Sequence, residues 1–102
     1  MLAIVCPGQG SQTPGFLEPW LELPGIAEAL RQWSEATKVD LVAHGTTSDE
    51  ETIKDTAVAQ PLIVAAGLLA AQALDTDKLD PQRWMTAGHS VGEITAAGLA
   101  SV

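Results

Sequence analysis

The sequence has one cysteine, few basic residues and no long apolar segment, and each scarcity excludes a class of protein. Cys6 alone can form no disulfide within the chain and no cysteine-rich zinc site. Only 5 Lys and Arg residues stand against 13 Asp and Glu residues, which gives a net charge of −8. Nucleic acids and anionic membrane surfaces attract clustered positive charge, so we expect neither as a partner.

The first residues of the sequence and the length of its apolar runs predict where in the cell the protein is located. The first residues carry no basic leader and Pro7 ends their apolar run, so no secretory signal is expected. Together with the single cysteine, this predicts a cytoplasmic protein. The longest apolar stretch, Leu62–Leu74, has thirteen residues and falls short of the about 20 that a membrane-spanning helix takes. We therefore expect it to be a buried core helix.

The order of the expected elements predicts an α/β fold with a parallel sheet. Leu2–Cys6 is a short apolar run that Pro7-Gly8 closes, which is typical of a strand buried on both faces. A second buried strand is expected over 84–88. Helices are expected over 25–38, from near Asp49 after a Ser48–Glu51 capping box, over 61–74 with Pro61 in the first turn, and over 92–100.

The length of 102 residues allows one small domain, and 46% hydrophobic residues argue against disorder. Two strands alone do not make a stable sheet core, and the last helix has no capping glycine. We therefore expect residues 1–102 to be the N-terminal part of an incomplete α/β domain.

The motif with the most specific chemistry is Gly88-His89-Ser90-Val91-Gly92, a G-x-S-x-G sequence between an expected strand and an expected helix. A nucleophilic serine needs a tight turn that exposes its hydroxyl, and the two glycines remove side chains that would collide there. The helix that follows directs its first N–H groups towards developing negative charge. This context favours Ser90 as a nucleophile over a residue that only caps a helix.

Neither histidine is a clear general base for Ser90. His89 is its neighbour in sequence, and neighbours at such a turn point in different directions, which favours a role in supporting the turn. His44 lies near the end of a short expected helix, where a cation is favourable. If neither is the base, the proton acceptor that a serine needs is missing from this chain.

A second motif, Gly8-Gln9-Gly10-Ser11-Gln12, follows the first expected strand and is a loop by composition. Its glycines leave backbone N–H groups accessible at the edge of the sheet where ligands bind. The third glycine of a dinucleotide fingerprint is absent, and Pro14 follows instead. An ordinary turn is the alternative, but beside the Ser90 turn an oxyanion hole is favoured.

Three motifs together resemble the malonyl-CoA:acyl carrier protein transacylase family: Pro7–Gln12, Ala59-Gln60-Pro61 and Gly88–Glu93. The resemblance covers essentially all of this chain but only about the first third of the usual family member. It implies an α/β-hydrolase-like parallel sheet with flanking helices, present here only in part. A ferredoxin-like subdomain is expected beyond the chain end.

The resemblance also implies a reaction. Ser90 would attack the thioester of malonyl-CoA, and the phosphopantetheine thiol of acyl carrier protein would then collect the malonyl group. The implied roles are backbone oxyanion-hole donors at Gln9 and Val91, a substrate-binding side chain at Gln60, and support of the turn by Gly88, His89 and Gly92. No metal or redox cofactor is implied, because coenzyme A enters as the substrate's carrier.

Two parts of the family's machinery are not found in this sequence. The catalytic histidine and the arginine that pairs with the malonyl carboxylate are expected from further chain, and neither Arg31 nor Arg83 matches that arginine. The remaining part of its own enzyme is therefore an expected partner. The branched Val91 favours malonyl over methylmalonyl.

Three alternatives stay open at this point. The chain can be a fragment of an acyltransferase domain in a modular synthase, although Met1 directly before the first strand favours a standalone enzyme. It can be a non-catalytic interaction segment that needs a partner chain. A generic serine hydrolase or lipase fits the Ser90 motif but not the other two motifs. The pathway, fatty acid or polyketide, is left open.

Overall fold

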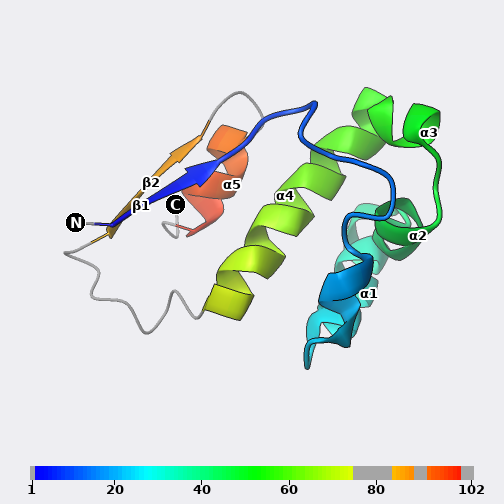
Figure 1. Ribbon diagram of the computed structural model, residues 1–102, viewed down its shortest axis with the longest axis horizontal. Helices are drawn as coiled ribbons and strands as arrows, with labels where there is room; N and C mark the ends of the chain where they lie inside the picture. Colours follow the sequence, from blue (N-terminus) through cyan, green and yellow to red (C-terminus); the bar gives the residue numbers. More distant parts are fainter. Residues whose placement is uncertain (1, 75–83, 89–91, 100–102) are drawn as a thin grey trace.

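A computed structural model of the chain describes residues 2–74, 84–88 and 92–99. The elements run in the following order: β1 (Leu2–Cys6), the 3₁₀ helix η1 (Glu18–Glu22), α1 (Ile26–Thr37), α2 (Leu41–Thr46), α3 (Glu50–Lys54), α4 (Thr56–Leu74), β2 (Trp84–Gly88) and α5 (Gly92–Leu99). The two strands lie at one side of the molecule, α4 crosses its middle, and α1, α2 and α3 lie on the other side (Figure 1).

β1 and β2 pair in parallel, with Leu2 opposite Trp84 and Cys6 opposite Gly88. α5 packs against both strands and against α4, so a helix layer lies beside the sheet. The expected α/β arrangement with a small parallel sheet is confirmed. Both strands end at the same edge of the sheet, where Cys6 lies opposite Gly88.

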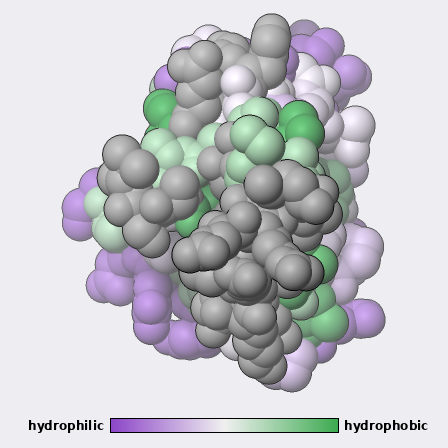
Figure 2. All heavy atoms as spheres, turned by 90° about the vertical axis from the view of Figure 1, so that its left-hand side faces the viewer, coloured by the Kyte–Doolittle hydropathy of each residue, from purple (hydrophilic) through white to green (hydrophobic). Residues whose placement is uncertain are grey.

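The expectation that β1 is buried on both faces is wrong within this chain. Cys6 is buried, but Val5 is 73% exposed, and Met85 on the paired strand is 54% exposed. Ala3 and Ala87 on the same face are exposed as well. The reason is that the described helices cover one face of the sheet only. Seen from the sheet side, apolar surface lies beside the residues drawn in grey (Figure 2).

The core gathers around α4 on the side away from the sheet. Its buried members come from the segment before η1 and from α1, α2, α3 and α4: Leu17, Ile26, Leu30, Leu41, Ile53, Leu62, Ala65 and Leu69. Trp20 and Trp33 are partly buried and pack against this cluster. The side chain of Trp84 lies outside the described part of the structure.

α1 occupies the expected range, and its ends are set by two residues with left-handed backbone. Gly25, at φ 83°, precedes the helix and Lys38, at φ 62°, follows it. Ile26 and Leu30 of this helix are buried. Thr37 is exposed, and its hydroxyl donates to the Trp33 carbonyl at 2.7 Å.

α4 begins at Thr56, so the expectation that Pro61 lies in its first turn is wrong. Asp55 makes the earlier start possible, because its side chain accepts from the Ala57 N–H at 3.0 Å. The Asp55 carbonyl accepts from the N–H groups of Val58 and Ala59. Pro61 has no N–H to donate to the Ala57 carbonyl, which leaves one helical bond unmade.

The earlier start also makes α4 longer than the sequence predicts, and its length now reaches that of a membrane-spanning helix. At 19 residues it is long and apolar enough, by length and composition alone, to cross a membrane. The core helix of a soluble protein meets the same criterion. Here six of its residues are buried, and it contacts α1, α2, α3 and α5. These contacts make α4 the central packing element of the described fold.

Candidate functional site

Two of the expected motifs meet at the carboxyl edge of the sheet. The Gly8–Gln12 loop follows β1, and Gly88 ends β2 opposite Cys6. His89, Ser90 and Val91 lie outside the described residues, so their expected roles stay predictions. The structure does describe the glycines on either side of them, Gly88 and Gly92.

Gly92 begins α5 and lies against the end of β1. A Cβ atom at Gly92 would lie 2.1 Å from the Cys6 carbonyl oxygen and 2.7 Å from that of Pro7. Neither distance is possible for two non-bonded atoms, and both contacts are with backbone, which cannot swing away. Only glycine fits here. The start of α5 is therefore held directly beside the residues that lead into the Gly8–Gln12 loop.

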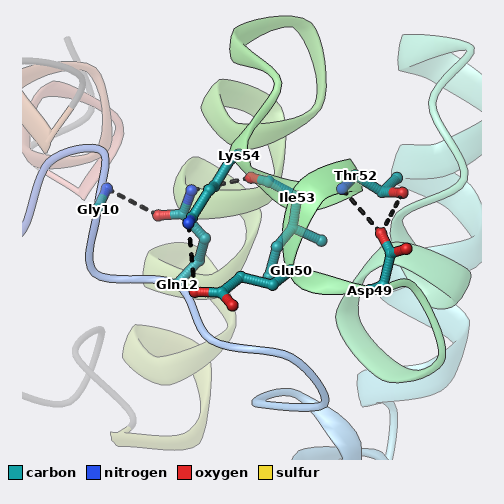
Figure 3. A network of polar contacts seen from close by, with 7 residues as sticks. All are labelled: Gly10, Gln12, Asp49, Glu50, Thr52, Ile53 and Lys54. Carbon is teal, nitrogen blue, oxygen red and sulfur yellow. Dashed lines mark hydrogen bonds and ion pairs between the residues drawn. The ribbon is translucent and has the colours of Figure 1, made fainter.

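The side chain of Gln12 joins the Gly8–Gln12 loop to α3 (Figure 3). The Gly10 N–H donates to Gln12 Oε1 at 2.8 Å, and Gln12 Nε2 donates to the Ile53 carbonyl at 2.9 Å. Gly10 has φ 108°, a conformation that favours glycine. Gln12 was given no role by the sequence, although it stands in the motif; it is a positioning residue for this loop.

The segment that receives Gln12 is itself capped. Asp49 Oδ1 accepts from the Thr52 hydroxyl at 2.6 Å and from the Thr52 backbone N–H at 2.9 Å, and these hydrogen bonds lower the pKa of the Asp49 carboxyl. The helix near Asp49 is confirmed, but the expected cap at Ser48 is wrong. The Ser48 hydroxyl pairs instead with His44 Nδ1 at 2.9 Å. Figure 3 shows the Asp49 cap beside the Glu50–Lys54 ion pair.

Gln9 places its side chain on the junction between α3 and α4. Its Nε2 lies 3.4 Å from the Lys54 carbonyl and 3.4 Å from the Thr56 hydroxyl. Within the described residues nothing accepts a hydrogen bond from the Gln9 backbone N–H. The side chain is thus used for anchoring, and the backbone donor that was expected in an oxyanion hole remains available.

Gln60 stands one helical turn after Thr56, so it lies on the same side of α4 as the residue that Gln9 contacts. It is exposed and lines a cavity of ≈300 Å³ between α1, α2, α4 and α5. The other lining residues are Trp33, Thr37, Leu41, Pro61, Val64, Ala65, Leu68 and Ile94. Ile94 belongs to the first turn of α5, so this cavity adjoins the helix that follows the Ser90 motif.

The cavity beside Gln60 is apolar, and no cationic side chain is among its described lining residues. A carboxylate bound there would have no opposite charge, and burying an unpaired charge is costly. The described part of the chain therefore offers a polar side chain at the rim of the cavity but no partner for the carboxylate of a malonyl group.

Other reactive side chains take structural positions. Cys6 is 3% exposed, and burial raises the pKa of its thiol, which agrees with an inert buried cysteine. His44 is half-buried in the last turn of α2 and bonded to Ser48. Among the described residues, no group of three or more His, Cys, Asp and Glu side chains could hold a metal ion.

Comparison with known proteins gives one consistent result. The curated malonyl CoA-acyl carrier protein transacylase of Mycobacterium tuberculosis is 55% identical over 103 residues, which cover 100% of this chain and 34% of that protein. The crystal structure of MCAT from the same organism superposes with a TM-score of 0.92 at 54% identity. No protein-family model matches the chain.

Two further matches come from polyketide synthesis. The first is the solved structure of a type II PKS acyl-carrier protein in complex with its malonyl-transacylase. A chain of that structure matches at 31% identity with a TM-score of 0.85, and the match covers 99% of this chain and 33% of the other. The phenolphthiocerol synthesis polyketide synthase type I of Mycobacterium marinum is 36% identical over 98% of this chain and 5% of that protein. The chain spans about a third of the length of the curated transacylases that it matches.

Proposed function

We propose that this chain carries the nucleophile and the oxyanion hole for the transfer of a malonyl group. The premise is that it corresponds to the N-terminal third of a malonyl CoA-acyl carrier protein transacylase. The observation that supports this most is the contact of Gly92 with the end of β1. It holds the helix after the Ser90 motif beside the Gly8–Gln12 loop. A nucleophile and the N–H donors of its oxyanion hole must lie close together to act on the same carbonyl group.

In the proposed reaction Ser90 Oγ attacks the thioester carbonyl of malonyl-CoA, and the coenzyme A thiol leaves as the malonyl ester forms. The phosphopantetheine thiol of acyl carrier protein then attacks the ester, forms a new thioester and restores the serine hydroxyl. A base must take the serine proton in the first step and give it to the leaving coenzyme A sulfur; in the second step it takes the proton of the phosphopantetheine thiol and gives it to the serine oxygen. We assign that base to a histidine in further chain.

The remaining roles follow from the same arrangement. The backbone N–H groups of Gln9 and Val91 stabilise the oxyanion of each tetrahedral intermediate. Gln60 hydrogen-bonds near the acyl group, and Gly88, His89 and Gly92 support the turn. An arginine in further chain pairs with the malonyl carboxylate, because the cavity beside Gln60 has no cation among its described residues. No cofactor is needed besides the two thioester carriers.

The proposal extends to the setting of the enzyme. The fold is an incomplete α/β-hydrolase-like domain of residues 1–102, with a ferredoxin-like subdomain in the further chain. Acyl carrier protein is the acceptor, which the complex of a related malonyl-transacylase with its carrier protein supports. The net charge of −8 gives this segment no field that attracts an acidic carrier. We place the reaction in the cytoplasm, in fatty acid or polyketide synthesis.

An acyltransferase segment of a modular synthase is the second candidate. The 36% identity to a type I polyketide synthase over nearly the whole chain favours it. The chemistry at Ser90 is the same in both candidates, and a reading frame that continues into a ketosynthase distinguishes them.

The test joins residues 1–102 to the part of the Mycobacterium tuberculosis relative that lies beyond the matched region. After brief exposure to malonyl-CoA, we expect the intact mass to rise by one malonyl group. Ser90→Ala removes the added mass, whereas Ser48→Ala, which deletes a hydroxyl bonded to His44, keeps it. A folded fusion that takes up no malonyl group, or uptake that persists in Ser90→Ala, contradicts the proposal.

A further inference from the structure

The first four residues of the Gly8–Gln12 loop form a β-turn with Gln9 and Gly10 in its middle. The Ser11 N–H lies 3.4 Å from the Gly8 carbonyl oxygen, and the Ser11 hydroxyl donates to the same oxygen at 2.9 Å. Gly10 has φ 108°, and a positive φ at this place is what a type II turn requires. The Gly8 carbonyl thus accepts two hydrogen bonds from one residue.

The Ser11 hydroxyl acts on the peptide unit that carries the Gln9 N–H. The Gly8 carbonyl and the Gln9 N–H belong to this one unit, whose atoms lie in a plane. The peptide is trans, so the two groups point in opposite directions. A hydrogen bond that holds the Gly8 carbonyl towards Ser11 therefore holds the Gln9 N–H away from it. The same bond polarises the peptide unit and makes its N–H a better donor.

Gln12 holds the next peptide unit, which joins Gln9 to Gly10. The Gly10 N–H donates to Gln12 Oε1 at 2.8 Å, and Gln12 Nε2 donates to the Ile53 carbonyl at 2.9 Å (Figure 3). A backbone N–H can only donate and a carbonyl can only accept, so the two partners fix the orientation of the Gln12 amide. Ile53 lies in the last turn of α3, where carbonyls have no partner within the helix and can accept from the loop.

We propose that Ser11 and Gln12 are positioning residues for the Gln9 N–H, because each holds one of the two peptide units that meet at Gln9. This inference rests on the proposed function, in which the Gln9 N–H is a donor of the oxyanion hole. The Gln9 side chain is anchored at the junction of α3 and α4, and within the described residues its backbone N–H donates to no acceptor. Such a donor is effective only if it already points to the place where the negative charge develops.

The test uses the fusion of residues 1–102 with the remaining part of the Mycobacterium tuberculosis relative. The single-turnover rate of malonyl uptake is measured at a series of malonyl-CoA concentrations. Ser11→Ala and Gln12→Met are each expected to lower the maximal rate about tenfold, less than the about 10²–10³-fold that follows the loss of an oxyanion donor. The half-saturating concentration should stay unchanged, since the donor acts on the oxyanion. Ser11→Thr keeps the hydroxyl and should restore the rate.

Ser48→Ala and Gln32→Met are the matched controls. Their side chains bond to His44 and Glu28, outside the loop, so both variants should keep the rate of the parent. The proposal is overturned if the controls slow uptake as much as the loop variants, or if Ser11→Thr is as slow as Ser11→Ala. Circular dichroism shows whether each variant is folded, and the Ser11 variants decide if Gln12→Met is not.

A second measurement does not depend on malonyl chemistry. In NMR relaxation of the 102-residue chain, the Gln9 N–H should have an order parameter near about 0.85, typical of a rigid backbone, that falls towards about 0.6 in Ser11→Ala and Gln12→Met. Unchanged order parameters overturn the proposal. If a folded fusion takes up no malonyl group, the proposed function fails, and the order parameters still decide whether Ser11 and Gln12 hold this N–H. Uptake at the parent rate in both loop variants overturns this proposal alone.

Discussion

The first residue of α5 lies so close to the end of β1 that a methyl group does not fit between them. Because the Cβ atom of an alanine at position 92 would meet two backbone carbonyls, α5 must move to accept it. We expect Gly92→Ala to lower the free energy of unfolding by about 1–3 kcal/mol. Urea denaturation of the isolated chain measures this.

Gly98 is the matched control for Gly92, because it lies in the same helix. A Cβ atom there would lie 3.4 Å from Leu68 Cδ2, the end of a flexible side chain. Alanine in a helix interior is preferred to glycine by up to about 1 kcal/mol, so Gly98→Ala is expected to be neutral or stabilising. Equal losses in the two variants would show that α5 is only sensitive to substitution in general.

Thr95 offers a second test at a single side chain. Its buried hydroxyl makes no hydrogen bond, and valine has nearly the same shape without the polar atom. Thr95→Val is expected to raise the free energy of unfolding of the free chain by about 1 kcal/mol. Thr46→Val is the comparison, because the Thr46 hydroxyl donates to the Val42 carbonyl at 2.7 Å and its loss should destabilise. A loss of stability in Thr95→Val would indicate that its hydroxyl has a partner.

A site residue can be predicted from the sequence only if its residue type and spacing are characteristic of one chemical role. Glycines at fixed spacing around a serine have one, and the second of them, Gly92, lies directly against the end of β1. Gln12 has none, because an amide that bonds one carbonyl and one N–H can stand anywhere in a loop. Its role depends on α3, which is forty residues away in sequence, and only the folded chain brings the two together.

Among the elements, α3 gives a prediction of pH dependence. Hydrogen bonds from Thr52 hold the pKa of Asp49 below its usual value. A carboxyl with a lowered pKa in the folded state stabilises above its unfolded pKa, and this contribution is lost as the pH falls through the folded value. We therefore expect α3 to loosen in acid below about pH 4, the ordinary range of an aspartate.

Asp49→Asn isolates this effect, since asparagine also caps helices but does not titrate. At neutral pH the two proteins should have similar melting temperatures. Below about pH 4 the melting temperature of the unmodified chain should fall further than that of Asp49→Asn. Parallel curves over the whole pH range would contradict the assignment of the cap to the Asp49 carboxylate.

Element boundaries were harder to predict than the elements themselves. Each expected helix and strand is present, because apolar periodicity and apolar runs mark them directly. The start of α4 was missed, since Pro61 suggested a first turn while the Asp55 cap lay further upstream. The spacing of Ser48 and Glu51 predicts a cap at Ser48, but Asp49 is one residue closer to the helix, and its side chain accepts from the Thr52 N–H.

For the whole molecule, the bare face of the sheet predicts how the chain behaves in solution. Val5 and Met85 are exposed side by side with Ala3 and Ala87. We expect this chain to bind the dye ANS and to associate at high concentration. The double variant Val5→Thr with Met85→Gln should reduce both effects and change the free energy of unfolding by no more than about 0.5 kcal/mol. Sedimentation velocity measures the association.

Leu23→Gln is the control for this surface, because Leu23 is exposed but lies away from the sheet. It should change neither dye binding nor association. If it reduces them as much as the double variant, the sheet face is not responsible. The sequence predicted strands without predicting this face, because an apolar run shows that a strand is normally covered but not which chain covers it.

The parallel pairing of β1 with β2 has a consequence for the order of synthesis. β1 contains the first residues described, whereas its partner begins at Trp84. At a synthesis rate of about 5–20 residues per second, β1 leaves the ribosome several seconds before β2 does. α1 to α4 also precede β2 in the sequence, so they can begin to pack around their own core before β2 emerges. The nascent chain is thus expected to fold its helices first and to hold an unpaired strand that a ribosome-associated chaperone can bind.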